Sequence, residues 1–271
     1  MIPLPQPTKI VEQKASSAGQ KQNRGVFVIE GLYPGYGVTI GNSLRRVLLS
    51  SLEGAAITQV KIKGVSHEFS TLPGVLEDVV SILLNLKQAR FRLYGQEPQK
   101  ASLKQKGEKE VTCADFELPA SLELVTKDLP LAHLTEKSAE LEIEIQVEKG
   151  IGYVPAEQQK REKQEIGSIT LDAIFTPIKR VSSRVENMRV GDRTDFNRVT
   201  LEIETDGTLS PEEALYQATE ILLKQFEVVR SGVKEAVEAR LESLRQAKGA
   251  EPEKPSRPGK AKKPKALSKK P

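Results

Sequence analysis

The chain has 271 residues, of which 38% are hydrophobic, and a formal net charge of +4, a composition sufficient for an ordinary hydrophobic core. A single cysteine excludes a disulfide framework within the chain, and no apolar run approaches the roughly 20 residues of a membrane-spanning helix. The N-terminal segment lacks the apolar stretch of a signal peptide, so we expect a cytoplasmic protein without a membrane anchor.

The positive charge is concentrated at the C-terminus. Residues 249–271 contain eight Lys or Arg against two Glu, a net of +6, which leaves −2 for residues 1–248. This tail is rich in Lys and Pro and has little apolar surface to bury, which predicts disorder. The net charge therefore gives no reason to expect nucleic-acid binding by the body of the chain.

In chain order, the pattern predicts strands near both ends, a mixed central part and two main helices. The first helix is expected from Thr39 or Gly41 to Leu52, with Gly54 ending it in a left-handed conformation. The last helix has a clear start, because Ser210, Pro211 and Glu213 fit a capping box. The other expected elements are a flexible leader at 1–23, strands at 26–32, 56–65, 89–95, 140–150 and 198–207, a helix at 72–87, a loop or weak hairpin at 96–110, and one or two strands within 166–186.

Alternation is clearest at 140–150, where Leu141, Ile143, Ile145 and Val147 are separated by polar residues. This period is typical of an antiparallel sheet with one face buried. Strands that follow one another, with helices before and after them, predict an α+β fold rather than a doubly wound one.

Three glycines, Gly35, Gly37 and Gly41, precede the first helix. Their spacing differs by one position from the dinucleotide-binding pattern, and no Gly-Lys-Ser or Gly-Lys-Thr follows. We favour a tight turn and close helix packing over a phosphate site, with a nucleotide-binding enzyme as the alternative.

Residues with catalytic or metal-binding chemistry are few and scattered. His67, His133 and Cys113 have no partner at the spacing of a zinc site or of a nucleophile and its base. We therefore predict no catalytic residue, no cofactor and no metal ligand in this chain.

The first helix has a leucine face formed by Leu44, Leu48 and Leu52. Arg46 lies on the far side of the helix, and Arg45 lies beside the leucine face. A helix of this kind suits packing on one protein partner while a guanidinium contacts another.

Three segments resemble the bacterial type of RNA polymerase α subunit. They are "GYGVTIGNSLRRVLLSSLEGAAITQVKIKGVSHEFSTLPGVLEDVVSILLNLK" (35–87), "GIGYVPA" (150–156) and "TPIKRVSSRVENMRVGDRTDFNRVTLEIETDGTLSPEEAL" (176–215). The likeness spans residues 24–232.

This resemblance implies a homodimer on which the β and β′ subunits assemble, with the subunit itself non-catalytic. It implies a dimerisation subdomain from 24–54 and 173–235, an inserted, mostly-β subdomain at 55–172, a helical extension at 236–248 and the tail at 249–271. The residues implied are Leu44, Leu48, Leu52, Leu215, Leu222 and Phe226 at the dimer interface, Arg45 and Arg46 toward β, and Asp172, Arg180, Arg193 and Phe196 toward β′.

The family usually continues into a small C-terminal domain that binds promoter DNA. Only 39 residues follow Gly232, so we do not expect that domain here. DNA contact would then be weak, indirect or confined to phosphates reached by the tail. A free-standing dimer that binds nucleic acid through this tail is the alternative function.

Overall fold

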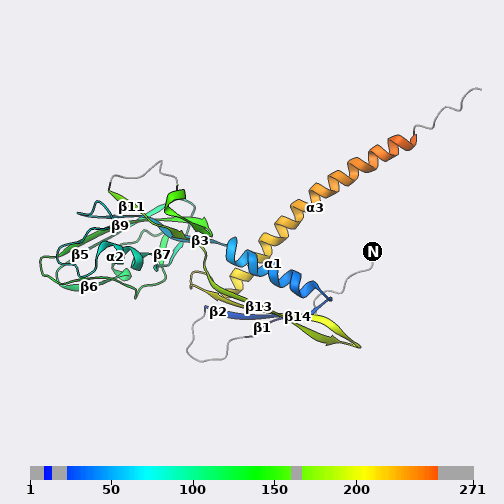
Figure 1. Cartoon of the computed structure of the whole chain (residues 1–271), viewed down its shortest axis with the longest axis horizontal. Coiled ribbons are helices and arrows are strands. Elements are labelled where there is room, and N and C mark those ends of the chain that lie inside the picture. The colour runs from blue at the N-terminus through cyan, green and yellow to red at the C-terminus, as the bar shows by residue number, and fades with distance from the viewer. Residues whose placement is uncertain (1–8, 14–22, 160–166, 250–271) are drawn as a thin grey trace, which may run out of the picture. The chain divides into compact units, whose positions relative to one another are not determined.

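The computed structural model describes residues 9–13, 23–159 and 167–249, and it divides into two compact units, Met1–Lys224 and Gln225–Pro271. The first unit contains the sheets, and the described part of the second is the continuation of one long helix, α3 (Pro211–Gly249). The Lys/Pro-rich tail after Gly249 and most of the predicted leader lie outside the described residues. The fold is α+β, as predicted (Figure 1).

Within the described residues, one antiparallel sheet has four strands in the order β1-β2-β14-β13. Its centre brings distant parts of the sequence together, since Phe27 pairs with Leu201 and Ile29 with Val199. The leader differs from the flexible segment expected, because residues 9–13 pair along β2. The strands are β1 (Lys9–Gln13), β2 (Arg24–Leu32), β13 (Ile178–Val190) and β14 (Arg193–Thr205).

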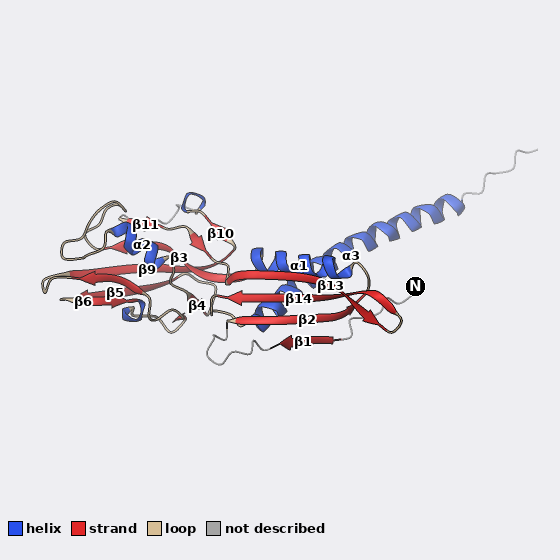
Figure 2. Ribbon diagram, turned by 60° about the horizontal axis from the view of Figure 1, so that its bottom comes forward, coloured by secondary structure: helices blue, strands red, loops and turns tan. Residues whose placement is uncertain are grey.

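Helix α1 (Tyr36–Ser50) lies across one face of this sheet (Figure 2). Leu44 and Leu48 of the helix, together with Leu52 just after it, pack with the buried strand residues and with Ala214 and Ala218 of α3. Burying this apolar face, at about 25 cal/mol per Å², is what holds the helix on the sheet. We call this sheet, α1 and the first turns of α3, up to Lys224, the platform.

Between α1 and β13 the chain forms a second, mostly β region, which we call the insert (55–172). Its main sheet has six strands within the described residues, in the order β5-β9-β3-β4-β7 with β11 on β3. One helix, α2, packs its apolar side on this sheet. The elements between α1 and β13 are β3 (Glu53–Ile62), α2 (Val79–Leu86), β4 (Phe91–Leu93), β5 (Gln99–Lys106), β6 (Lys109–Thr112), β7 (Leu122–Leu124), β8 (Pro130–Leu134), β9 (Glu140–Ile151), β10 (Tyr153–Val154), β11 (Ser168–Thr170) and β12 (Ala173–Ile174).

Three local predictions were wrong. The segment 96–110 is not a weak hairpin, because β5 pairs along β9 while β6 pairs with β8. The second helix is shorter than expected and starts at Val79, with Asp78 as its N-cap. Gly54 does not end α1. It lies in β3, where an added Cβ would come 1.8 Å from the carbonyl oxygen of Phe175, so the glycine serves a close approach of two chain segments.

The buried apolar residues form two large clusters rather than one. One cluster lies in the insert, between its six-stranded sheet and α2, and the other lies in the platform. A small cluster of Ala56, Ala173 and Phe175 lies where the chain enters and leaves the insert. The two regions therefore have separate cores, and the predicted boundaries at 54/55 and 172/173 stay a prediction.

Candidate subunit-contact surfaces

The glycine-rich turn before α1 is occupied by a side chain of the platform. Gly35 has φ 88°, in the left-handed region, and its backbone N–H donates to Oδ1 of Asn197 at 2.9 Å. The N–H of Gly37 donates to the same oxygen at 3.3 Å. A Cβ on Gly37 would lie 2.7 Å from Val185, so the glycine allows α1 to approach the sheet closely. The turn serves packing, as predicted, and Asn197 takes the N–H groups that a phosphate would need.

The leucine face of α1 points into the platform. Leu44, Leu48 and Leu52 are 5%, 0% and 1% exposed, and all three pack on the sheet of their own chain. Within one chain these side chains pack on its own sheet, and their place at the dimer interface stays a prediction. Sequence periodicity found the apolar face correctly, but it could not distinguish a partner's surface from the chain's own sheet.

The exposed surface of α1 carries the arginine pair. Arg45 and Arg46 are both exposed, and neither guanidinium forms an ion pair with any residue that the structure describes. The Ser50 hydroxyl donates to the carbonyl oxygen of Arg46 at 2.8 Å, which adds a local tie near the end of the helix. Two unpaired cations on a rigid helix form a surface that suits an acidic partner.

Helix α3 begins at the predicted capping box. The Ser210 N–H donates to Glu213 at 3.1 Å, and the Glu213 N–H donates to the Ser210 hydroxyl at 3.2 Å. Within the first unit, Leu215 and Leu222 are half-buried against the platform core, which brings them together with the leucines of α1.

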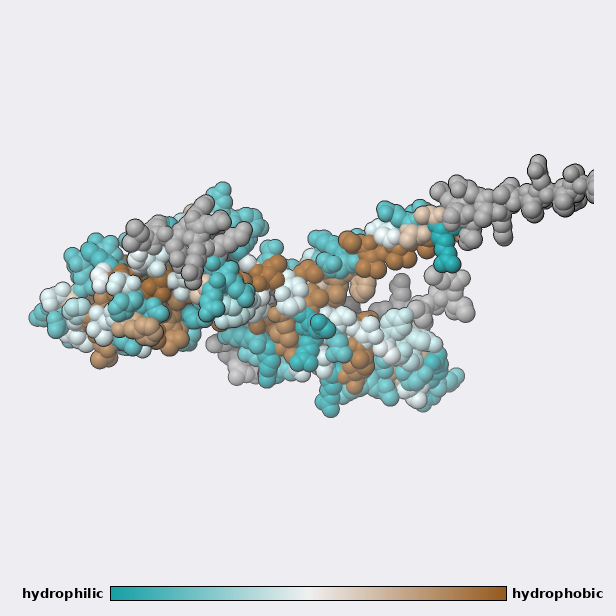
Figure 3. All heavy atoms as spheres, turned by 45° about the horizontal axis from the view of Figure 1, so that its top comes forward, coloured by the Kyte–Doolittle hydropathy of each residue, from teal (hydrophilic) through white to brown (hydrophobic). Residues whose placement is uncertain are grey.

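In the second unit, Phe226 is 62% exposed, and the apolar residues that follow at helical spacing are also exposed. Figure 3 shows hydrophobic residues along this helix. This exposed stripe consists of Phe226, Val229, Val233, Val237 and Leu241. An exposed row of this length is typical of a helix that packs on another protein surface.

The four residues predicted to contact β′ do not form one patch. Arg193 holds Asp195 with a two-pronged contact at 3.0 and 2.6 Å and lies 5.2 Å from the ring centre of Phe196 and 5.5 Å from that of Tyr33. The hydrogen bond from Arg193 lowers the pKa of the Asp195 carboxyl. Arg193 and Phe196 thus share a cluster at the turn of the β13–β14 hairpin.

Arg180 lies toward the other end of that hairpin, where its guanidinium is 3.5 Å from Glu202 and from Glu204. Asp172 lies in the segment that leaves the insert. It accepts from Nζ of Lys87 at 2.8 Å and from the N–H of Ala156 at 3.0 Å, and these bonds lower the pKa of its carboxyl. Asp172 therefore anchors the "GIGYVPA" loop to the end of α2.

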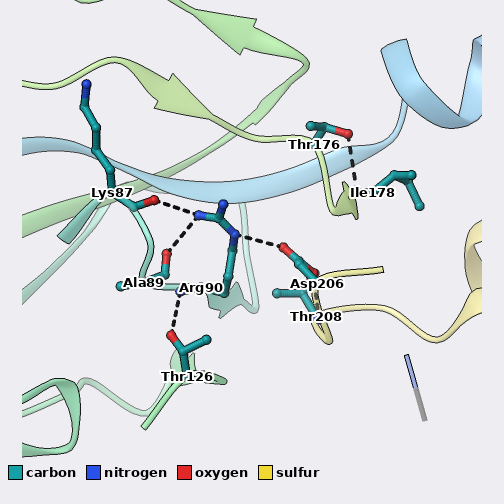
Figure 4. A network of polar contacts seen from close by, with 8 residues as sticks. All are labelled: Lys87, Ala89, Arg90, Thr126, Thr176, Ile178, Asp206 and Thr208. Carbon is teal, nitrogen blue, oxygen red and sulfur yellow. Dashed lines mark hydrogen bonds and ion pairs between the residues drawn. The ribbon is translucent and has the colours of Figure 1, made fainter. Parts of the chain in front are cut away.

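A polar network between the insert and the platform had no signal in the sequence. Arg90 points toward Asp206, with 3.4 Å between Nε and Oδ2, and its Nη1 donates to the carbonyl oxygens of Lys87 and Ala89 (Figure 4). The Asp206 side chain is only 4% exposed. The two residues are 116 positions apart in sequence, and nothing local in either segment marks them as partners.

Histidine and cysteine do not form a reaction site in the described part of the chain. Nδ1 of His133 lies 2.5 Å from Oε1 of Glu77, on the insert surface. Burial raises the pKa of the Cys113 thiol to about 12, so it is not a thiolate nucleophile near neutral pH. The described residues contain no group of His, Cys, Asp and Glu arranged to hold a metal ion. None of the helices in that part of the chain is long and apolar enough to cross a membrane.

An α+β platform with an inserted β region and exposed apolar and arginine side chains on its helices is typical of a protein that binds other proteins. Residues 60–176 match the family model described as "RNA polymerase Rpb3/RpoA insert domain". The chain is 50% identical over 214 residues to a DNA-directed RNA polymerase subunit alpha of Symbiobacterium thermophilum, covering 79% of this chain and 68% of that relative. Its counterpart in Syntrophomonas wolfei is 50% identical over 219 residues (80% and 67%), and that in Carboxydothermus hydrogenoformans 44% over 220 residues (81% and 70%). The chain belongs to the family of DNA-directed RNA polymerase α subunits.

Proposed function

We propose that this chain acts in transcription as the α subunit of a DNA-directed RNA polymerase, as a homodimeric scaffold in the cytoplasm on which the β and β′ subunits assemble. The single observation that carries this proposal is the 50% identity over 214 residues to a relative with that name. Nucleotidyl transfer belongs to the assembled polymerase, and this proposal assigns no catalytic residue or cofactor to the chain itself. The alternative of a free-standing nucleic-acid-binding dimer is not favoured, because relatives that match about 80% of this chain are named as subunits of an RNA polymerase.

The homodimer forms through the exposed stripe of α3. Support comes from Phe226, Val229 and Val233, which are exposed apolar residues at helical spacing. The buried leucines of α1 support the interface from within, by holding the helix on the sheet, rather than by touching the second copy.

The two large partners contact different surfaces of the platform. The β subunit binds the exposed face of α1 through Arg45 and Arg46, which are free of ion pairs with the described residues. The β′ subunit binds the hairpin cluster of Arg193 and Phe196, with Arg180 and Asp172 contributing separate contacts. Exposed arginines beside aromatic rings are typical of residues that dominate protein interfaces.

The proposal is tested by co-expressing a tagged copy of the chain with the β and β′ subunits of its own cell. The expected result is a complex that retains both large subunits through gel filtration. A tagged, folded chain that elutes without either subunit would overturn the proposal. The tagged Leu48→Asp variant, which should not fold, shows how much β and β′ the resin retains by itself.

A further inference from the structure

The connection between insert and platform has the form of a hinge. The chain enters the insert along β3 and leaves it through residues 172–178, and these two crossings touch each other. Phe175 packs on Gly54 and Gly150, where an added Cβ would collide with its carbonyl oxygen or its ring. The two large cores do not merge, so apolar packing between them does not by itself fix one region against the other.

A second point of contact lies across a small cleft from these crossings. The cleft has a volume of about 170 Å³, and its lining includes Gly54 and Ala55 of β3, Arg92 of β4 and Thr208. Polar contacts between the insert and the platform lie beside this cleft, since Arg92 and Thr208 both line it and bond to each other.

These contacts involve two arginines of the insert, Arg90 and Arg92. Arg90 and its partner Asp206 are each also oriented by hydrogen bonds within their own region. Nε of Arg90 lies 3.4 Å from Oδ2 of Asp206, and Arg92 donates to the carbonyl oxygen of Thr208 from Nε at 2.9 Å and from Nη2 at 2.6 Å. On the insert side, Arg90 is fixed by the carbonyl oxygens of Lys87 and Ala89 at 2.9 and 3.3 Å (Figure 4).

On the platform side, Oδ1 of Asp206 accepts from the Thr208 N–H at 2.9 Å and from its hydroxyl at 2.6 Å. The Asp206 N–H donates to the carbonyl oxygen of Pro177, just before β13. A carboxylate that is 4% exposed and already oriented is costly to leave without its cation. The pair therefore favours the orientation in which Arg90 and Asp206 meet.

The network continues from Arg90 into a loop of the insert. The carbonyl oxygen of Lys87 accepts from Arg90, and Nζ of the same lysine donates to Asp172 at 2.8 Å. Asp172 in turn accepts from the N–H of Ala156 in the "GIGYVPA" loop. The contacts of Arg90 are thus linked through Lys87 and Asp172 to the "GIGYVPA" loop, close to where the chain leaves the insert.

We infer that Arg90 and Asp206 are positioning residues that lock the insert at one orientation on the platform, so that the contact surfaces for β and β′ are presented together. The assembly part of this inference rests on the proposed function. The lock itself does not, because it concerns contacts within one chain.

The lock is tested by electron–electron double resonance between nitroxides at Glu108→Cys on the insert and Ser182→Cys on β13, both at exposed positions. Cys113 is fully buried and does not compete for label. Samples are diluted with unlabelled chain so that distances within one chain dominate. Arg90→Met and Asp206→Asn should broaden the distance distribution, and Arg90→Lys should give a distribution of intermediate width. The control Arg24→Met removes an exposed arginine from the platform and should leave the distribution unchanged.

The same variants are then assembled with β and β′. Because apparent affinity falls with the fraction of chains in the competent orientation, Arg90→Met and Asp206→Asn should weaken assembly by roughly tenfold. Distributions as narrow as that of the unmutated chain in both variants would overturn the lock. Broad distributions with unchanged assembly would overturn its role in positioning. If the unmutated chain captures neither subunit, the proposed function fails while the distance measurement still decides the lock.

Discussion

Oδ1 of Asn197 lies 2.9 Å from the backbone nitrogen of Gly35, so a strand near the C-terminal end of the platform caps the turn that starts its first helix. The same oxygen accepts from Gly37, and the Asn197 side chain is largely buried. This contact ties residues 162 positions apart and closes the turn against anions.

Replacing Asn197 by Ala should therefore destabilise the fold. Two backbone N–H groups would lose their acceptor in a partly buried turn, at a cost of about 2 kcal/mol in the free energy of unfolding. Urea denaturation followed by circular dichroism measures this. Asn42→Ala on the exposed side of α1 is the matched control and should change stability little. An Asn197→Ala variant as stable as the control would contradict the capping role.

The contact of His133 with Glu77 should make stability depend on pH. The hydrogen bond to Glu77 raises the pKa of His133 above its ordinary 6.5. Burial alone raises the pKa of Glu77, but the bonds from His133 outweigh it and place the pKa below 4.5. The histidine contribution is fully present below pH 6.5 and is lost as pH rises through its raised folded pKa. The glutamate contribution is present above pH 4.5 and is lost as pH falls through its lowered folded pKa.

The stability difference between the unmutated chain and His133→Gln should thus be largest between pH 4.5 and 6.5 and should shrink at alkaline pH. Denaturation curves across this range measure it, with the exposed His67→Gln as the control. A difference that grows as pH rises would have the wrong sign for this contact.

The dimer prediction separates two kinds of apolar residue. Leu48 is fully buried in its own chain, so Leu48→Asp should unfold the platform, costing more than the 2–5 kcal/mol typical of Leu→Ala. Phe226 is exposed, so Phe226→Asp should give folded monomers. Sedimentation with circular dichroism distinguishes these outcomes. Lys224→Asp, another exposed position on α3, should remain dimeric. An unmutated chain that sediments as a monomer at micromolar concentration would refute the dimer.

Arg46 should matter for a partner but not for folding. Arg46→Ala should leave the dimer intact and weaken capture of β by about 2 kcal/mol if the guanidinium meets a buried carboxylate. A pull-down titration with β measures this, and Arg24→Ala provides an exposed arginine outside the predicted surface. Equal capture by both variants would remove Arg46 from the β contact.

The tail should act on DNA through charge alone. Residues 249–271 have no aromatic residue to stack on bases, so contact would be limited to phosphates. Each phosphate contact should add roughly 0.9 to the slope of log affinity against log salt. Deleting 249–271 should spare the dimer and reduce DNA retention at low salt. If the truncated chain retains DNA as well as the full chain does, the tail does not bind DNA and serves only to keep the protein soluble.

Local signals in the sequence identified the elements that depend on neighbouring residues. The capping box at Ser210 and Glu213 and the alternation in β9 were both predictable, because each depends on a few adjacent positions. Strand β5 was missed because its lysines pair with glutamates of β9, and only that distant strand makes it half-buried. Resemblance to the family indicated an inserted region, which residues 60–176 match, and it suggested partner surfaces that stay a prediction.

Contacts between distant segments could not be predicted in this way. Leu48 has the same spacing whether it faces a partner or its own sheet, and the structure puts it on the sheet. The position of Gly54 after the first helix suggested a helix end. The structure shows that a glycine is needed there because the backbone of Phe175, 121 positions later in the sequence, lies too close for a Cβ. Arg90 and Asp206 have ordinary sequence surroundings, and only the folded chain brings them together.

This chain is proposed to be the assembly subunit of an RNA polymerase. The most direct measurement is native mass spectrometry of a mixture of the purified chain with β and β′ from its own cell, followed by a transcription assay on the same mixture. We predict a complex with two copies of this chain, one β and one β′, and RNA synthesis that is absent when the chain is omitted. Assembly and RNA synthesis by β and β′ at the same level without this chain would contradict the claim.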